Sequence, residues 1–342
     1  MSGYENKDGI LTVTFNPAVD KTVFVDGRFR AGELNRSSAS LISCGGKGIN
    51  VSRALCKLGC RTTAVGFCGG IFGEILKNGL EREQVPHSLV QTAAQTRMNI
   101  KIIDSFGGCT EVNDSGYAVT FDETEQLFSL VKRESEKYKV VVIAGSFPQG
   151  VENNVQNLMI NKLSEMNIRV VCDMSGDRLR AAVKAHPYMI KPNIHELSEL
   201  IGKPVESFEE AVENSERIYK KTGVTVLCTV GKSGSVYSGV EGTYIANAPE
   251  VAVRGFAGAG DTYLAAFLCS RFGYPDGSGS AVKQNNKKYT SESPDNSEKV
   301  ITCAMKTAAS AAAAAVECPG TELPEACRMM ELRDIIKVKR IS

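Results

Sequence analysis

The chain has 342 residues, of which 42% are hydrophobic and 23% charged, and its 40 Lys and Arg against 39 Asp and Glu give a net charge of +1. This composition is typical of a globular protein and excludes the basic surface expected of a nucleic-acid-binding protein. The polar N-terminal segment and the lack of an apolar run of about 18 residues argue against a signal peptide and a membrane span. We therefore expect a cytoplasmic protein with small-molecule partners.

Short β-branched runs alternate along the chain with longer amphipathic stretches. Strands are expected at 10–15, 62–67, 140–144, 169–172, 188–190 and 224–229, with a hairpin at 234–238 and 243–246. Helices are expected at 47–58, 73–83, 208–222 and 299–316, and a helical pattern also follows residue 261. This order predicts an α/β fold: a doubly wound, mostly parallel sheet flanked by helices.

Two segments depart from this alternation. Residues 22–43 and 96–112 show β-type patterning with no helix between their halves, which predicts a small antiparallel sheet standing over the site as a lid. Residues 273–297 are rich in Gly, Ser, Asn, Lys and Pro, which predicts a mobile insertion. We expect residues 1–342 to form a single domain that carries both features.

The eleven cysteines are scattered and form no Cys-x-x-Cys pair. Their spacing matches no zinc pattern, and several lie inside apolar strand-like runs. We interpret all eleven as reduced structural thiols.

The segment Gly258-Ala259-Gly260-Asp261 leads directly into an apolar helical run. Glycine allows close approach of the backbone to a ligand, and the first N–H groups of a helix attract an anion. Asp261 is compatible with two roles. It is either a helix N-cap or the acceptor of a proton from a hydroxyl that attacks a phosphoryl group.

Two further turns have ligand-binding potential. Gly45-Gly46-Lys47-Gly48-Ile49-Asn50 opens a helix and suits a phosphorylated or polyhydroxyl ligand, although a plain strand-to-helix turn explains it equally well. In Lys191-Pro192-Asn193-Ile194-His195-Glu196, Asn193 and Glu196 form a capping box or organise magnesium and its waters around nucleotide phosphates.

Three weaker signals lie at other strand ends. Thr229-Val230-Gly231-Lys232-Ser233-Gly234 could border a nucleotide, and Asp20 could bind sugar hydroxyls. Arg97, on the expected lid, could pair bidentately with a phosphate.

Taken together and in this order, these motifs resemble the PfkB-type (ribokinase-like) sugar kinases over residues 10–336. Within that family the chain is most similar to the 1-phosphofructokinase and tagatose-6-phosphate kinase branch. The residues that support this are Asn16-Pro17-Ala18-Val19-Asp20, Thr96-Arg97, Gly145-Ser146-Phe147-Pro148 and Pro319-Gly320-Thr321-Glu322.

The resemblance implies a kinase that uses ATP and magnesium. It implies that Asp261 is the catalytic base and that the N–H groups of Gly258, Ala259 and Gly260 stabilise the transferring phosphoryl group. The residues implied to bind the acceptor are Asp20, Gly46, Lys47, Asn50, Arg97, Lys101 and Ser146. Those implied on the nucleotide and metal side are Lys191, Asn193, Glu196, Thr229, Gly231 and Gly234, with Asn193 and Glu196 holding the metal through water.

The sequence therefore favours phosphorylation of a ketohexose phosphate, most of all fructose 1-phosphate. Tagatose-6-phosphate or fructose-6-phosphate kinase activity is the alternative within enzymes, and a catalytically silent sugar-phosphate sensor is the alternative of another class. An exposed edge on the lid sheet makes a homodimer the expected assembly.

Overall fold

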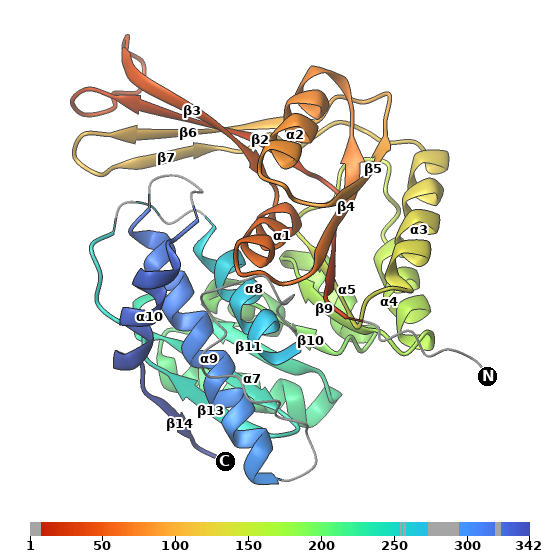
Figure 1. The fold of residues 1–342 in the computed structure, drawn as a ribbon, viewed down its shortest axis with the longest axis vertical. Helices are drawn as coiled ribbons and strands as arrows, with labels where there is room; N and C mark the ends of the chain where they lie inside the picture. The colour runs from red at the N-terminus through yellow and green to blue at the C-terminus, as the bar shows by residue number, and fades with distance from the viewer. Residues whose placement is uncertain (1–7, 254, 256–257, 273–293, 319–322) are drawn as a thin grey trace.

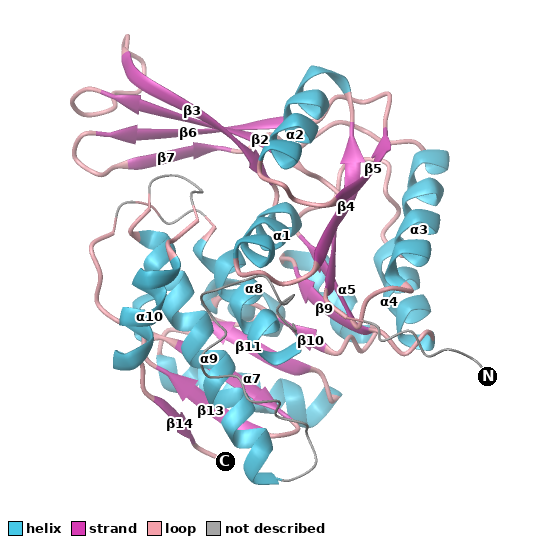
Figure 2. Ribbon diagram, viewed as in Figure 1, coloured by secondary structure: helices cyan, strands magenta, loops and turns pink. Residues whose placement is uncertain are grey.

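The computed structural model describes residues 8–253, 255, 258–272, 294–318 and 323–342. Within these ranges a ten-stranded sheet has the order β14-β13-β12-β11-β10-β9-β8-β1-β4-β5, and a four-stranded sheet has the order β3-β2-β6-β7. Helices cover both faces of the larger sheet, while the smaller sheet projects to one side of the body (Figures 1 and 2). The predicted α/β class is confirmed.

Seven neighbouring strands of the large sheet are parallel, and the remaining edge is antiparallel. The parallel strands are β1 (Ile10–Thr14), β4 (Thr62–Cys68), β5 (His87–Gln91), β8 (Val140–Ala144), β9 (Arg169–Asp173), β10 (Met189–Ile190) and β11 (Thr225–Thr229). The antiparallel edge is formed by β12 (Ser235–Gly239), β13 (Gly242–Ala246) and β14 (Val338–Arg340).

Strand β8, near the centre of the sheet, is apolar on both faces, which suits a strand covered by helices on both sides. On β8, Val141 and Ile143 pack in the core beneath one layer of helices. Their neighbours Val140 and Val142 pack in the core beneath the opposite layer. The first layer is α3 (Phe121–Ser135), α4 (Val155–Glu165), α5 (Gly176–Lys184), α6 (Ile194–Ile201) and α7 (Phe208–Thr222). The second is α1 (Lys47–Lys57), α8 (Ala259–Phe272) and α9 (Pro294–Val316), with α10 (Ala326–Ile335) packed on α9.

Helix α9 contains the segment Ser297–Val316, which by length and mean hydropathy of 1.2 would be long and apolar enough to cross a membrane. Of that segment, 56% is buried inside the protein, and Ile301, Ala304 and Met305 pack against residues of α8. Its apolar character is that of a core helix. The predicted 273–297 insertion overlaps its start, because the helix begins at Pro294, a residue favoured in the first helical turn. Residues 273–293 lie outside the described part of the chain.

The small sheet consists of β2 (Ala18–Val25), β3 (Ser37–Gly45), β6 (Arg97–Asp104) and β7 (Cys109–Val112). The prediction of a purely antiparallel sheet is wrong, since its central pair β2 and β6 is parallel. Between β3 and β6 the chain passes through α1, β4, α2 (Gly70–Arg82) and β5. A connection of this length allows β6 to enter the small sheet in the same direction as β2. Helix α2 packs against the base of this sheet.

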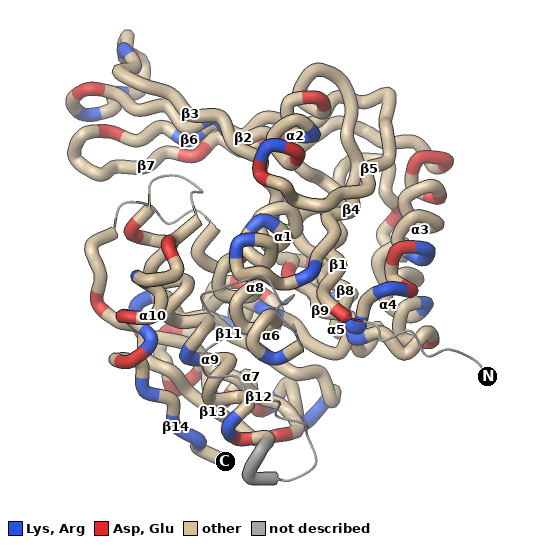
Figure 3. The backbone as a smooth tube through the Cα atoms, viewed as in Figure 1, with Lys and Arg blue, Asp and Glu red and all other residues tan. Residues whose placement is uncertain are grey.

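Acidic and basic residues are interspersed along the chain, as the red and blue segments of the backbone in Figure 3 show. All eleven cysteines lie in the described part of the chain with no disulfide between them, and Cys109 and Cys327 are exposed, so these two have no packing role in the core.

Candidate active site

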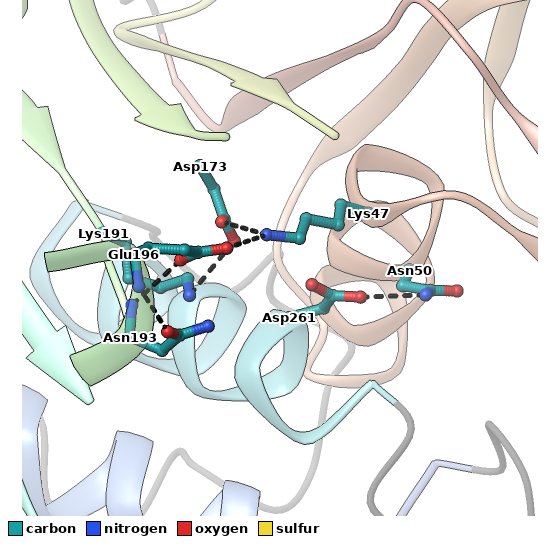
Figure 4. Close-up of polar contacts among 7 residues, drawn as sticks. All are labelled: Lys47, Asn50, Asp173, Lys191, Asn193, Glu196 and Asp261. Atoms are coloured by element: carbon teal, nitrogen blue, oxygen red, sulfur yellow. Dashed lines mark hydrogen bonds and ion pairs between the residues drawn. The ribbon is translucent and has the colours of Figure 1, made fainter. Parts of the chain in front are cut away.

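The candidate site lies where the carboxyl ends of the parallel strands meet the first turns of the helices. This is the edge at which α/β sheets bind ligands. Figure 4 shows side chains from α1, from the end of β9, from the turn between β10 and α6, from the first turn of α6, and from α8 gathered there. They are Lys47, Asn50, Asp173, Lys191, Asn193, Glu196 and Asp261.

Asp261 lies in the first turn of α8 with its side chain inside the cluster, so the N-cap alternative does not describe its position. Asp261 is 7% exposed as a whole residue, and its carboxylate accepts a hydrogen bond of 2.8 Å from the Asn50 amide. Burial and then the nearby charge of Asp173 raise the pKa of Asp261 to about 6, against the opposing effect of Lys47. The result is a carboxylate that can take up a proton near neutral pH.

Lys47 connects two carboxylates that come from different parts of the chain. Its ammonium lies 2.8 Å from Asp173 Oδ1 and 3.1 Å from Glu196 Oε1. Although burial opposes the charged form, these two carboxylates raise the pKa of Lys47 above its ordinary value. Lys191 lies 3.2 Å from the other Asp173 oxygen, and the two lysines hold the pKa of Asp173 below its usual range despite burial.

Asp173 is the main residue of the cluster that the sequence reasoning missed. It is fully buried at the last position of β9, one residue beyond the strand expected at 169–172. An acidic residue at the carboxyl end of a parallel strand was an available signal, and it is the same signal that singled out Asp20. A fully buried carboxylate is stable here because two ammonium groups face it.

The Asn193 and Glu196 capping box is confirmed. The Asn193 side chain accepts from the Glu196 N–H and the Glu196 carboxylate accepts from the Asn193 N–H, both at 2.9 Å. Glu196 also binds Lys47, so the carboxylate that caps α6 belongs at the same time to the charged cluster. Thr229 adjoins Asn193 through an isolated β-bridge, and the turn that contains Gly231 and Gly234 follows.

The glycine turn before α1 is tightly packed. Gly46 has φ of 101°, a backbone conformation that favours glycine. A Cβ on Gly45 would lie 2.5 Å from the Asp20 carboxyl carbon, and one on Gly48 would lie 2.3 Å from Thr14 Oγ1. The turn therefore brings the start of α1 against the end of β1 and the base of the lid, which a plain connecting turn would not require.

Asp20 lies inside β2 of the lid sheet and not, as expected, at the end of the first strand, and it has two buried partners. It accepts a hydrogen bond of 2.9 Å from Asn99 and pairs with Lys101 at 3.1 Å. Lys101, expected to contact a phosphate, is thus already ion-paired in this structure. The register explains the grouping, because Asp20 and Asn99 are directly opposite on neighbouring strands and Lys101 follows on the same face.

Arg97 donates hydrogen bonds to the carbonyl oxygens of Asn16 (3.2 Å) and Asp114 (2.6 Å). The Asn16 amide in turn donates to Ser146 Oγ at 3.2 Å. The structure thus brings Arg97 and Ser146 together through Asn16, a residue to which the sequence reasoning gave no role.

Comparison with known proteins identifies the group to which this arrangement belongs. Residues 9–326 match the pfkB family of carbohydrate kinases. The chain is 36% identical to a 1-phosphofructokinase of Bacillus subtilis (76% of this chain, 84% of the relative) and 30% identical to one of Vibrio cholerae (76% and 81%). A solved structure of a possible 1-phosphofructokinase from Thermotoga maritima superposes with a TM-score of 0.80 at 26% identity, covering 97% and 99% of the two chains. The chain belongs to the pfkB family and is a carbohydrate kinase.

Proposed function

We propose that this kinase transfers the γ-phosphoryl group of ATP to the free primary hydroxyl of fructose 1-phosphate, forming fructose 1,6-bisphosphate. The choice of acceptor is supported by the relatives named as 1-phosphofructokinases. The observation that carries the chemistry is the buried Asp261 carboxylate at the start of α8, bound by Asn50 and close to Lys47.

In this proposal, Asp261 accepts the proton of the attacking hydroxyl. A pKa of about 6 leaves it mostly ionised at neutral pH yet basic enough to take up a proton as the new bond to phosphorus forms. The N–H groups of Gly258, Ala259 and Gly260 stabilise charge on the transferring phosphoryl group. Positioning by the surrounding residues supplies most of the rate, as is usual for phosphoryl transfer.

The acceptor is held from the lid side. Asp20, Gly46 and Asn50 bind the sugar hydroxyls, and Lys47, Arg97, Lys101 and Ser146 bind its existing phosphate. Because Lys47 is paired with Asp173 and Glu196 in this structure, it exchanges at least one carboxylate for phosphate when the acceptor binds. Lys101 makes the corresponding exchange from Asp20.

The nucleotide lies on the opposite side, along Lys191, Asn193, Glu196, Thr229, Gly231 and Gly234. Among the described residues, no three or more His, Cys, Asp or Glu side chains are grouped so as to hold a metal ion. Mg²⁺ commonly uses one or two carboxylates together with phosphates and waters, and the Glu196 carboxylate fits that pattern. When bound, the ion would neutralise charge on the ATP phosphates.

A panel of sugar phosphates tests the acceptor. We expect kcat/KM to be highest for fructose 1-phosphate, with tagatose 6-phosphate and fructose 6-phosphate at least tenfold lower, a discrimination of about 1.4 kcal/mol. A higher kcat/KM for either competitor would overturn the assignment of the acceptor. Tight sugar-phosphate binding with no ATP turnover on the whole panel would instead favour the sensor. Asp261→Asn serves as the control and should lower kcat by orders of magnitude.

We also propose that the lid mediates a homodimer. Ile42, Ile100 and Val112 are exposed and share one face of the small sheet, because Lys21 pairs with both Ile42 and Ile100, and Ile100 pairs with Val112. This face, apolar except for Lys21, is opposite to the polar face that carries Asp20, and a second copy would cover it. Sedimentation over a range of concentrations tests the assembly.

We place the enzyme in the cytoplasm, because eleven cysteines with no disulfide between them suit a reducing compartment.

A further inference from the structure

We propose that Arg53, held in place by Glu83, is a positioning residue for phosphoryl transfer that fixes the orientation of the Asn50 amide towards Asp261. The inference rests on the proposed role of Asp261 as the proton acceptor. Neither Arg53 nor Glu83 belongs to the groups assigned above to the acceptor, the nucleotide or the metal.

Arg53 lies one helical turn after Asn50 on α1, and it is 6% exposed. Its guanidinium makes a bidentate ion pair with Glu83 at the end of α2, at 2.5 Å from Nε and 2.9 Å from Nη2. A planar guanidinium bound through two nitrogens has little freedom to rotate. The direction of its third nitrogen, Nη1, is therefore set by Glu83.

Nη1 contacts both ends of the glycine turn. It donates to the Cys44 carbonyl oxygen at 3.2 Å and to Asn50 Oδ1 at 3.5 Å, the second being a long and weak contact. Cys44 precedes the Gly45-Gly46 turn and is paired with Val19 in the lid sheet. The Arg53 side chain thus connects Cys44, in the strand before the turn, with the Asn50 side chain, in the helix after it.

The chemistry of the partners admits one orientation of the Asn50 amide. Its NH₂ group faces the Asp261 carboxylate, which in its ionised form can accept hydrogen bonds but cannot donate them. Its oxygen faces the Arg53 guanidinium, which can donate hydrogen bonds but cannot accept them. Rotating the amide by half a turn would place a donor against a donor and an oxygen against a carboxylate. Arg53 consequently disfavours the rotated state even though its own contact with Asn50 is long.

The orientation matters because the hydrogen bond from Asn50 favours the ionised form of Asp261. Without Arg53 the rotated state of the amide is less disfavoured, and rotation removes this hydrogen bond and the fixed direction of the carboxylate. We expect Arg53→Gln to lower kcat by about 10- to 100-fold, as small misplacements of reacting groups do. We also expect the acidic limb of the kcat/KM profile to move to higher pH, which a general loss of stability would not cause.

The test is a double-mutant cycle with Arg53→Gln, Asn50→Leu and the double variant. The turnover of the wild-type enzyme, measured alongside, tests the proposed function separately. If Arg53 acts through the amide, adding Arg53→Gln to Asn50→Leu should change kcat less than about twofold. An equal fall in both backgrounds, or an unchanged kcat in Arg53→Gln alone, would overturn the inference. Arg82→Gln, an exposed neighbour of Glu83, is the matched control and should retain full activity.

A readout independent of turnover accompanies the cycle. The side-chain NH₂ resonances of Asn50, assigned by their loss in Asn50→Leu, should shift or broaden in Arg53→Gln and remain unchanged in Arg82→Gln. Unchanged resonances in Arg53→Gln would count against the inference even if the enzyme showed no turnover on any sugar phosphate. Should Arg53→Gln fail to fold, Glu83→Gln loosens the same guanidinium more mildly and is expected to have the same effects in the same direction.

Discussion

Asp261→Asn is expected to make the protein more stable at neutral and alkaline pH while abolishing its activity. The Asp261 carboxylate is buried, and its burial together with the charge of Asp173 disfavours the ionised form. Asparagine has nearly the same shape, can still accept a hydrogen bond from Asn50 and carries no charge. The substitution therefore removes an unfavourable charge from the folded state.

The size of the effect follows from the pKa shift. A rise from 3.8 to about 6 corresponds to about 3 kcal/mol, at about 1.4 kcal/mol per pH unit. Because the folded state binds the proton more tightly than the unfolded chain, the penalty is absent below the unfolded pKa of 3.8 and grows as pH rises through the folded value of about 6. The gain from Asp261→Asn should be about 3 kcal/mol at pH 8 and about half of that at pH 5.

Urea unfolding of both proteins at pH 8 and pH 5 measures this gain directly. A destabilised variant at pH 8, or a gain that does not diminish at pH 5, would refute the reasoning. Asp104→Asn provides a control of opposite sign. Backbone N–H groups, chiefly that of Gly108, lower the pKa of Asp104, so its removal should destabilise the protein at pH 8 and matter less as pH falls.

Two further predictions follow from the same site. In a pH-rate series, log kcat/KM should fall with a slope of one below a pH of about 6, because Asp261 becomes protonated in its surroundings of Asp173, Lys47 and Lys191. A fall that begins only near pH 4 would argue against Asp261 as the base. Gly45→Ala should raise KM for the sugar phosphate at least tenfold with a smaller change in kcat, because the added methyl group displaces the Asp20 carboxylate. Steady-state kinetics measure both constants, and an unchanged KM would contradict the role of Asp20.

The sequence predicted those parts of the fold that depend on local patterning. Strand β8 and helix α7 have the bounds expected from their apolar runs, since a doubly covered strand is continuously apolar and an amphipathic helix repeats every 3.6 residues. Helix α3 was missed although its start is encoded locally, by a capping box between Thr120 and Glu123.

The parts that could not be predicted depend on contacts between distant segments. Alternation identifies the lid strands but carries no information on their direction, so the parallel pairing of β2 with β6 was not foreseen. Asp173 and Arg53 gain their significance from partners 126 and 30 residues away, which no local pattern connects. The carboxylate of Asp173 is stable only where two lysines from separate turns converge.

The charges within the cluster do not add up to a positive site, and this has a consequence for how the site attracts its substrates. Lys47 and Lys191 face Asp173, Glu196 and Asp261, two positive charges against three negative ones when all are ionised, so the cluster itself contributes no net positive potential. A positive contribution comes instead from the oriented peptide groups at the starts of α1 and α8, whose positions are fixed by the fold. Such a site selects anions by the fit of their oxygens to these N–H groups and to the side chains proposed above to bind phosphate. Its affinity should therefore depend less on ionic strength than that of a surface that gathers anions by excess charge.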